Sequence, residues 1–352
     1  MEFAFTEEQA MIAETARDFF RENATSERTR KAMAGEGIDR ELWQAFGTEL
    51  GLAGLTVPEE HGGSGLGMVE LAIIAEAAGS QVSAIPLLGH AMVCAAVGAG
   101  GSDEAKATWL PKLAGGEAIC AIASTHSALE AEGDKLTGTI QCVPHGAVAD
   151  LLLVAAPKGM WLVETAADGV SVEGHTTMDQ TRPLATVKLD SAAATPLAQS
   201  FDVTMAAWSA GWIVLAAEAL GGAQETLERT VAYSLDRVQF GRQIGSFQAY
   251  KHRLADMMIE IEQARSAVYW AACAVDEGSD EAQMALHAAK SFCADTYFMC
   301  AGNMIQLHGG IGFTWEHDAH LFFKRARSIQ TLLMDGEFHR EQVARMVLGE
   351  AA

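Results

Sequence analysis

Basic residues are scarce in this chain. Its 352 residues include 24 Lys and Arg against 46 Asp and Glu, which leaves a formal net charge of −22. A chain this acidic has no electrostatic attraction for the phosphates of nucleic acids or for anionic membrane surfaces. The composition therefore argues against nucleic acid and membrane as partners.

Cysteine pairs and long apolar runs are missing as well. The cysteines are scattered without a Cys-x-x-Cys pair, which predicts reduced thiols in a cytoplasmic protein and no zinc site. The chain has no run of about 18 uninterrupted apolar residues, and this argues against a transmembrane helix. The acidic N-terminus lacks the basic and then apolar order of a signal peptide. We expect a cytoplasmic location.

Apolar residues make up 49% of the sequence, enough for two or three packed units. In the first part, Thr6 and Gln9 fit a capping box that opens a helix. Short apolar runs bounded by Gly, Pro and Asp then predict strands in the middle of the chain. Apolar residues at helical spacing follow over 203–236, 247–276, 280–307 and 317–334. The expected fold class is α+β and mostly helical, with an N-terminal helical domain (1–117), a small antiparallel β domain (118–200) and a C-terminal four-helix bundle domain (201–352).

Two short segments carry most of the chemical information. In the first, Arg237 could hold a phosphate bidentately, while Phe240 and Gln248 could cover and hydrogen-bond the rest of a nucleotide. In the second, Gly309 and Gly310 would let backbone N–H groups approach a pyrophosphate closely. Taken alone, the first segment is more typical of a turn between helices with a solvated Arg, and the second of a helix C-terminal cap.

The order and spacing of these segments resemble the flavin-binding signatures of the acyl-CoA dehydrogenase family. Two further stretches, Gly54 to Glu59 and Trp109 to Pro111, are similar to family motifs and come in the same order. The resemblance covers nearly the whole chain. It implies that FAD is the cofactor, that acyl-CoA is the substrate, and that the chain forms a homo- or hetero-oligomer, as a dimer or a dimer of dimers.

The resemblance also assigns roles to individual residues. The segments named above would reach across a subunit interface to the ADP half of the neighbour's FAD, and Ser124 and Thr125 would keep part of a role at the flavin. Gly211 and Trp212 lie where the family's substrate lies. The implied FAD ligands are Arg237, Phe240, Gln248, Gln306, Gly309, Gly310, Ser124 and Thr125.

The reaction that the resemblance implies needs a carboxylate base. The base takes the Cα proton of the thioester while a hydride leaves Cβ for the flavin, which gives a trans-2-enoyl-CoA, and an electron-transferring flavoprotein then oxidises the flavin. Asp335 occupies the place of the family's base, although it is one methylene, about 1.5 Å, shorter than a glutamate. The alternative is that Asp335 only caps a turn. Glu337 is a second candidate, although it aligns with a family Thr. Glu218 lies in an apolar helix, so we expect it to have either a partner or a raised pKa, in a structural role.

Three functions remain open at this level. The first is a dehydrogenase for bulky, branched or steroid-derived CoA esters. The second is a weakly or non-catalytic partner subunit of a heteromeric acyl-CoA dehydrogenase. The third is a flavin oxidase relative that uses an Asp base on a carbon acid without CoA.

Overall fold

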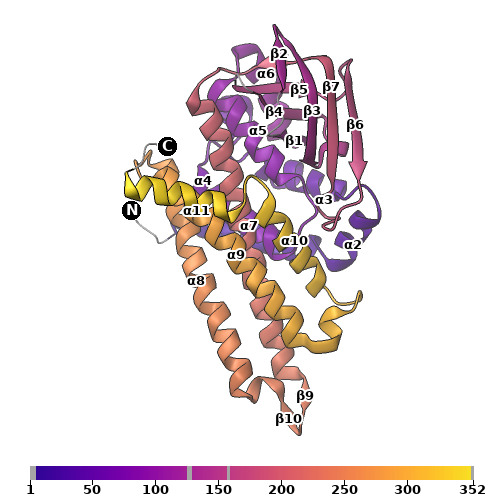
Figure 1. Cartoon of the computed structure of the whole chain (residues 1–352), viewed down its shortest axis with the longest axis vertical. Helices are drawn as coiled ribbons and strands as arrows, with labels where there is room; N and C mark the ends of the chain where they lie inside the picture. Colours follow the sequence, from indigo (N-terminus) through magenta and orange to yellow (C-terminus); the bar gives the residue numbers. More distant parts are fainter. Residues whose placement is uncertain (1–4, 125–128, 157–158, 350–352) are drawn as a thin grey trace. The chain divides into compact units, whose positions relative to one another are not determined.

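The computed structural model describes residues 5–124, 129–156 and 159–349. Helices come first, then strands, then helices again, as the colours of Figure 1 show along the chain. This order confirms the predicted fold class. The chain folds into two compact units, one made of Met1–Ser26, Met68–Ser83 and Trp212–Ala352, the other of Glu27–Gly67 and Ala84–Gly211. The division into three domains remains a prediction.

The first unit is built from helices. α9 packs against α8, α10 and α11, and α4 packs against both α1 and α8. α1 begins with the predicted capping box, in which the backbone N–H of Gln9 donates to Thr6 Oγ1 at 3.1 Å. The helices are α1 (Glu7–Asn23), α4 (Met68–Ser80), α8 (Gln248–Asp276), α9 (Ala282–His308), α10 (Ala319–Thr331) and α11 (Gly336–Leu348), joined by the part of α7 (Phe201–Asp236) that follows Gly211.

The helix α11 was not among the four predicted for the bundle domain. Among its residues only His339 is fully buried, so the apolar periodicity over 336–348 is a weak signal for a helix. In the structure α11 packs against α9, and the side chain of Asp335 caps its first turn.

Glycines let α4 and α7 cross with their backbones in contact. A Cβ on Gly79 would collide with the backbone of Glu218, and a Cβ on Gly221 would collide with the carbonyl of Glu76. Any larger residue at either position would force the helices apart. The same stretch of α7 packs Gly222 against the ring of Tyr297.

The second unit contains two four-stranded sheets. One has the strand order β1 (Cys120–Ala123), β4 (Leu151–Ala156), β5 (Gly159–Glu164), β8 (Thr195–Pro196). The other has the order β2 (Glu130–Glu132), β3 (Lys135–Pro144), β7 (Leu184–Ala193), β6 (Val170–His175). The β1–β4 pair is parallel and the other strand pairs of these two sheets are antiparallel. The expectation of a purely antiparallel unit was therefore wrong for β1 and β4, because the chain passes through β2 and β3 of the other sheet between them.

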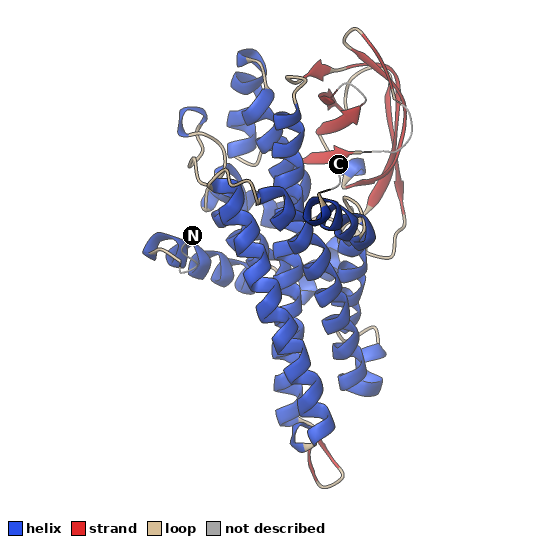
Figure 2. Cartoon of the chain, turned by 60° about the vertical axis from the view of Figure 1, so that its left-hand side comes forward, coloured by secondary structure: helices blue, strands red, loops and turns tan. Residues whose placement is uncertain are grey.

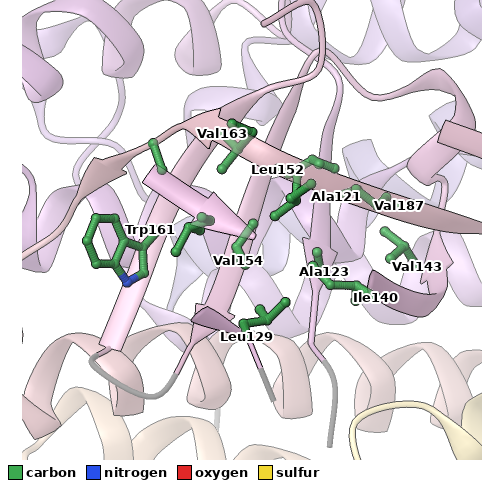
Figure 3. Packing of buried hydrophobic residues seen from close by; sticks show 14 of the residues in the cluster. Ala121, Ala123, Leu129, Ile140, Val143, Leu152, Val154, Trp161, Val163 and Val187 are labelled. Carbon is green, nitrogen blue, oxygen red and sulfur yellow. The ribbon is translucent and has the colours of Figure 1, made fainter. Parts of the chain in front are cut away.

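Side chains from both sheets form one apolar core, shown in Figure 3. Leu152, Val154 and Trp161 come from one sheet, and Ile140 and Val187 come from the other. All five are nearly or fully buried. Burial of apolar side chains on the facing sides of two sheets is the usual stabilisation of a β sandwich.

Helices also belong to the second unit. Figure 2 draws the helices of the whole chain in blue and its strands in red. The second unit has α2 (Ser26–Ala34), α3 (Arg40–Gln44), a π-helical turn (Ala45–Glu49), two 3-10 turns (Leu52–Gly54 and Glu59–His61), α5 (Leu87–Gly100) and α6 (Asp103–Ala114), with a further 3-10 turn (Gly146–Val148) beside the strands. Buried apolar residues cover α5 on all sides, which is typical of a core helix.

By length and composition alone, α7 could span a membrane. Its most apolar window is 78% buried inside the protein, and a core helix of this kind passes the same test.

Candidate active site

The first signature segment forms a β-hairpin between α7 and α8. Strands β9 (Val238–Gln239) and β10 (Arg242–Gln243) pair antiparallel, and Figure 1 labels them at the ends of the two helices. The two residues at the hairpin tip, Phe240 and Gly241, both have left-handed backbones with φ of 54° and 75°. Two positive φ values are typical of a type I′ turn, but a Phe in this conformation is strained.

The side chains of this hairpin point outward. Phe240 is 90% exposed, and Arg237 and Gln248 are exposed too. The Arg237 guanidinium has no hydrogen bond or ion pair with any residue that the structure describes. A large aromatic side chain that is both strained and exposed is costly in an isolated chain, so this surface is suited to contact something beyond it.

The second signature segment lies against the helix residues that flank the first. Tyr250 Oη on α8 donates to the Leu307 carbonyl at 3.2 Å, and Tyr233 Oη on α7 donates to the His308 carbonyl at 3.4 Å. The Tyr233 ring also stacks on the His308 ring with centroids 4.4 Å apart. Burial, with the Tyr233 phenol nearby, raises the pKa of Tyr250 to about 12, so its hydroxyl stays a donor. These contacts bring the end of α9 to the hairpin.

The backbone after α9 is open to a ligand. Gly309 has φ of 64°, and neither it nor Gly310 has a neighbour within 4 Å of where a Cβ would stand. Gln306 is exposed one turn earlier. An unobstructed glycine backbone and the unpaired Arg237 are the features that a pyrophosphate requires. The residues present therefore fit the ADP part of a dinucleotide.

Asp335 lies at the junction of α10 and α11. Its side chain is exposed, and its Oδ1 accepts a hydrogen bond of 3.0 Å from the backbone N–H of Phe338. This contact makes Asp335 the N-cap of α11. Glu337, the second candidate, is also exposed but lies within the first turn of α11.

The backbone just before Asp335 is strained. Leu333 and Met334 both have left-handed conformations, with φ of 52° and 75°. Each such residue without glycine's freedom costs roughly 1–2 kcal/mol. Two in succession persist only when the surroundings hold them.

Buried side chains hold this strained segment. Trp212 Nε1 donates to the Leu333 carbonyl at 3.1 Å, and His339 Nε2 lies 3.1 Å from the same oxygen. Lys290 Nζ donates to the Ile329 carbonyl at 2.9 Å and, more weakly, to the Met334 carbonyl at 3.4 Å. None of these three side chains is more than 6% exposed.

The titratable groups of this cluster are shifted by burial. Burial lowers the pKa of His287 to about 4 and, with the Lys290 charge nearby, lowers that of His339 to about 3. Burial also lowers the pKa of Lys290 to about 8, although attraction to carboxylates that include Asp335 opposes the shift. At neutral pH the two imidazoles are therefore uncharged, while Lys290 carries its proton.

Comparison with known proteins decides the family. The model for the acyl-CoA dehydrogenase N-terminal domain matches residues 6–117, and the model for the acyl-CoA dehydrogenase C-terminal domain matches residues 200–348. A protein of Mycobacterium tuberculosis named acyl-CoA dehydrogenase IpdE2 is 38% identical over 341 residues, which cover 97% of this chain and 96% of the relative. This chain belongs to the acyl-CoA dehydrogenase family.

Solved structures agree in fold. The ChsE4–ChsE5 complex of Mycobacterium tuberculosis contains a chain with a TM-score of 0.90 and 28% identity, and all of both chains is covered. A structure described as a Tcur3481–Tcur3483 steroid ACAD variant has a TM-score of 0.89 and 29% identity, with 97% of this chain and 98% of that chain covered. Acyl-CoA dehydrogenases are FAD-containing oxidoreductases, so the predicted enzyme class and cofactor are confirmed at the level of the family.

The remaining predicted acyl-CoA dehydrogenase residues lie in several places. Gly211 and Trp212 are consecutive buried residues of α7. Ser124 follows β1 and is half-buried, whereas Thr125 lies outside the described residues. Glu218 has the expected partner, because it forms a fully buried ion pair with Arg325 at 3.4 Å.

Sequence reasoning missed His287, Lys290 and His339, which belong to no signature. A signal was present for Lys290, since it is a lone cation among apolar residues of the predicted helix over 280–307. A charge at such a position is buried only when it has partners. The two histidines offered no comparable signal.

Proposed function

We propose that this acyl-CoA dehydrogenase converts an acyl-CoA thioester into a trans-2-enoyl-CoA, with Asp335 as the base that takes the Cα proton. The observation that carries the proposal is the position of Asp335. Its carboxylate is exposed at the end of a strained segment whose carbonyls are bound by buried side chains. A base that must reach the same carbon in every turnover needs a fixed backbone of this kind.

The cofactor is FAD, held by the exposed surface at the ends of α7 and α9. Arg237 is suited to a phosphate, the backbone of Gly309 and Gly310 to the pyrophosphate, and Phe240 and Gln248 to the adjoining nucleotide. When bound, the flavin supplies the acceptor for the hydride that leaves Cβ. Because these side chains point away from their own chain, the FAD they hold belongs to a neighbouring subunit, and an electron-transferring flavoprotein reoxidises it.

The substrate class we propose is a bulky, branched or steroid-derived CoA ester in a cytoplasmic catabolic route. One solved neighbour, 29% identical to this chain, is described as a steroid acyl-CoA dehydrogenase, and this description supports the class.

A second candidate is a partner subunit in a heteromeric acyl-CoA dehydrogenase. The ChsE4–ChsE5 neighbour is a complex of two different chains. In this chain, Phe240, Phe313 and Trp315 are between 59% and 90% exposed near the two signature segments. Exposed aromatic side chains of this size are typical of a surface that another chain covers. Either a second copy or a related chain would suit it.

The visible spectrum of the purified chain tests the proposal, recorded before and after anaerobic addition of a panel of acyl-CoAs. We expect a flavin spectrum that one bulky thioester bleaches within seconds. The Asp335→Asn variant should bind the same flavin and the same thioester, but its flavin absorbance should not be bleached, because the flavin is not reduced. Bleaching by the Asn variant at the wild-type rate would refute Asp335 as the base.

Other outcomes separate the alternatives. The partner-subunit function is favoured if the purified protein is colourless or if no thioester reduces its bound flavin. Mixing this chain with a related chain that co-purifies should then restore the bleaching of the flavin. Oxygen consumption with a carbon acid that lacks CoA favours a flavin oxidase.

A further inference from the structure

The segment that carries Asp335 rests on a pair of buried histidines in direct contact. His287 Nδ1 on α9 and His339 Nδ1 on α11 are 2.7 Å apart. His287 is 5% exposed and His339 is fully buried. Two imidazole nitrogens at this distance can form a hydrogen bond only if one carries a proton and the other does not.

The surroundings decide which nitrogen carries the proton. His339 Nε2 lies 3.1 Å from the Leu333 carbonyl oxygen, which can only accept, so His339 must carry its proton on Nε2. In the uncharged ring its Nδ1 is then an acceptor, and His287 must carry its proton on Nδ1. The hydrogen bonds run in one direction, from His287 to His339 to the Leu333 carbonyl.

The Leu333 carbonyl is saturated by this arrangement. It has two lone pairs, and Trp212 Nε1 at 3.1 Å occupies the second. The Trp212 ring also packs against both imidazoles, with centroids 4.7 Å from His287 and 5.3 Å from His339. Lys290 binds the carbonyls on either side, at Ile329 and Met334.

We propose that His287, His339 and Lys290 are positioning residues that hold Leu333 and Met334 in their left-handed conformations and thereby aim the Asp335 carboxylate at the substrate Cα. The inference rests on the proposed function of Asp335 as the base. His339 acts on the Leu333 carbonyl, and His287 acts through His339 by fixing its tautomer. The hydrogen bonds that His339 and Lys290 donate to backbone carbonyls offset the free energy that the left-handed conformations of Leu333 and Met334 cost. None of the three needs to touch the substrate.

Matched substitutions at His339 test the inference in the FAD-loaded enzyme in its native oligomer. Glutamine places an amide nitrogen where His339 has Nε2, so His339→Gln keeps the donor to Leu333, whereas His339→Leu removes it. A displacement of about 1 Å at the reacting group costs on the order of 10²-fold in rate. We expect about that loss in kcat for His339→Leu, with KM changed less than about threefold, and recovery to within about fivefold of wild type in His339→Gln.

A second pair of matched substitutions can be made at His287. Asparagine places its amide nitrogen where His287 has Nδ1, so His287→Asn should retain activity. His287→Leu should lower kcat, as His339→Leu does. His90→Leu is the control, because it removes an equally buried imidazole whose hydrogen bond goes to the Ala53 carbonyl. It should lower thermal stability without changing kcat below its unfolding temperature.

Two measurements do not depend on turnover. Nitrogen-15 NMR of histidine-labelled protein at pH 7 should find the proton of His287 on Nδ1 and that of His339 on Nε2, and the reverse tautomers or a charged ring would overturn the inference. Amide hydrogen exchange over residues 329–340 should be at least tenfold faster in His339→Leu and unchanged in His339→Gln. Equal exchange in both variants would also overturn it.

Failure of the inference and failure of the proposed function look different. If Asp335→Asn is inactive but His339→Leu keeps the wild-type kcat, Asp335 is the base and the positioning network is refuted. If Asp335→Asn keeps the wild-type activity, the proposed base is refuted. The tautomers and amide exchange then still decide whether the network holds the segment.

Discussion

Asp335 has two tasks that substitution can separate. Its Oδ1 caps α11 through the backbone N–H of Phe338, and its carboxylate is the proposed base. Asparagine is as good an N-cap as aspartate but has no basic oxygen. We therefore expect Asp335→Asn to leave the free energy of unfolding within about 0.5 kcal/mol of wild type, a few tenths being typical of exchanges among good N-cap residues. Flavin reduction should slow by about 10²–10⁴-fold, the usual contribution of a general base.

Two further substitutions complete the series. Asp335→Ala removes both functions, so it should lose activity and also about 1 kcal/mol of stability from the missing cap. For a chain of this size that corresponds to a Tm lower by about 2 °C. Asp335→Glu keeps the carboxylate but is a poor cap and extends the group by about 1.5 Å. It should lose stability as Ala does, yet retain a measurable part of the reduction rate.

Stopped-flow absorbance of the flavin and thermal unfolding of the same samples measure the two effects. We expect that activity and stability do not rank the variants in the same order. Among the three variants, Asp335→Asn should be the most stable but among the least active. Asp335→Glu should be less stable than Asp335→Asn but should reduce its flavin faster. If the reduction rate instead follows Tm across the series, Asp335 acts only as a cap. Unchanged FAD content in all three variants is the control.

Three other predictions follow from the buried and exposed charges. Arg325→Leu should destabilise by roughly 3–5 kcal/mol, because it leaves Glu218 buried without its partner, and adding Glu218→Leu should recover most of that loss in urea unfolding. The free energy of unfolding should fall as the pH drops from about 6.5 toward 4, because the pKa of His90 and of His287 is lowered to about 4 in the folded protein and the unfolded chain therefore binds more protons in this window. Acid titrations of unfolding should show a loss on the order of 2 kcal/mol for each of the two histidines by pH 5. Arg237→Leu should reduce the FAD retained in gel filtration at least tenfold. The Tm should change little, since the exposed Arg237 has no intramolecular partner among the described residues. An unchanged flavin content would show that Arg237 does not bind FAD.

The sequence by itself determined the family and the order of helices and strands, and it predicted which residues bind FAD. The capping box at Thr6 and the long helices of the bundle were readable because helix starts and apolar faces are set locally. The two signature segments were readable through their order and spacing, because each taken alone is also typical of a turn or of a helix cap. What the sequence left open was whether Asp335 caps a helix or acts as a base. The structure adds that it caps α11 and is exposed, so both tasks remain compatible.

Only the tertiary structure decided what surrounds Asp335. His287 and His339 are 52 positions apart, and nothing in either neighbourhood predicts a hydrogen bond between them. Lys290 could be recognised as an unusual charge, but its partners, the carbonyls of Ile329 and Met334, have no side-chain signature at all. Backbone carbonyls, left-handed φ values and imidazole tautomers depend on how distant helices pack, because the free energy that holds them comes from burial and not from local preference. The family and the candidate residues at the surface of this protein were therefore readable in its sequence, whereas the buried support beneath its proposed base was not.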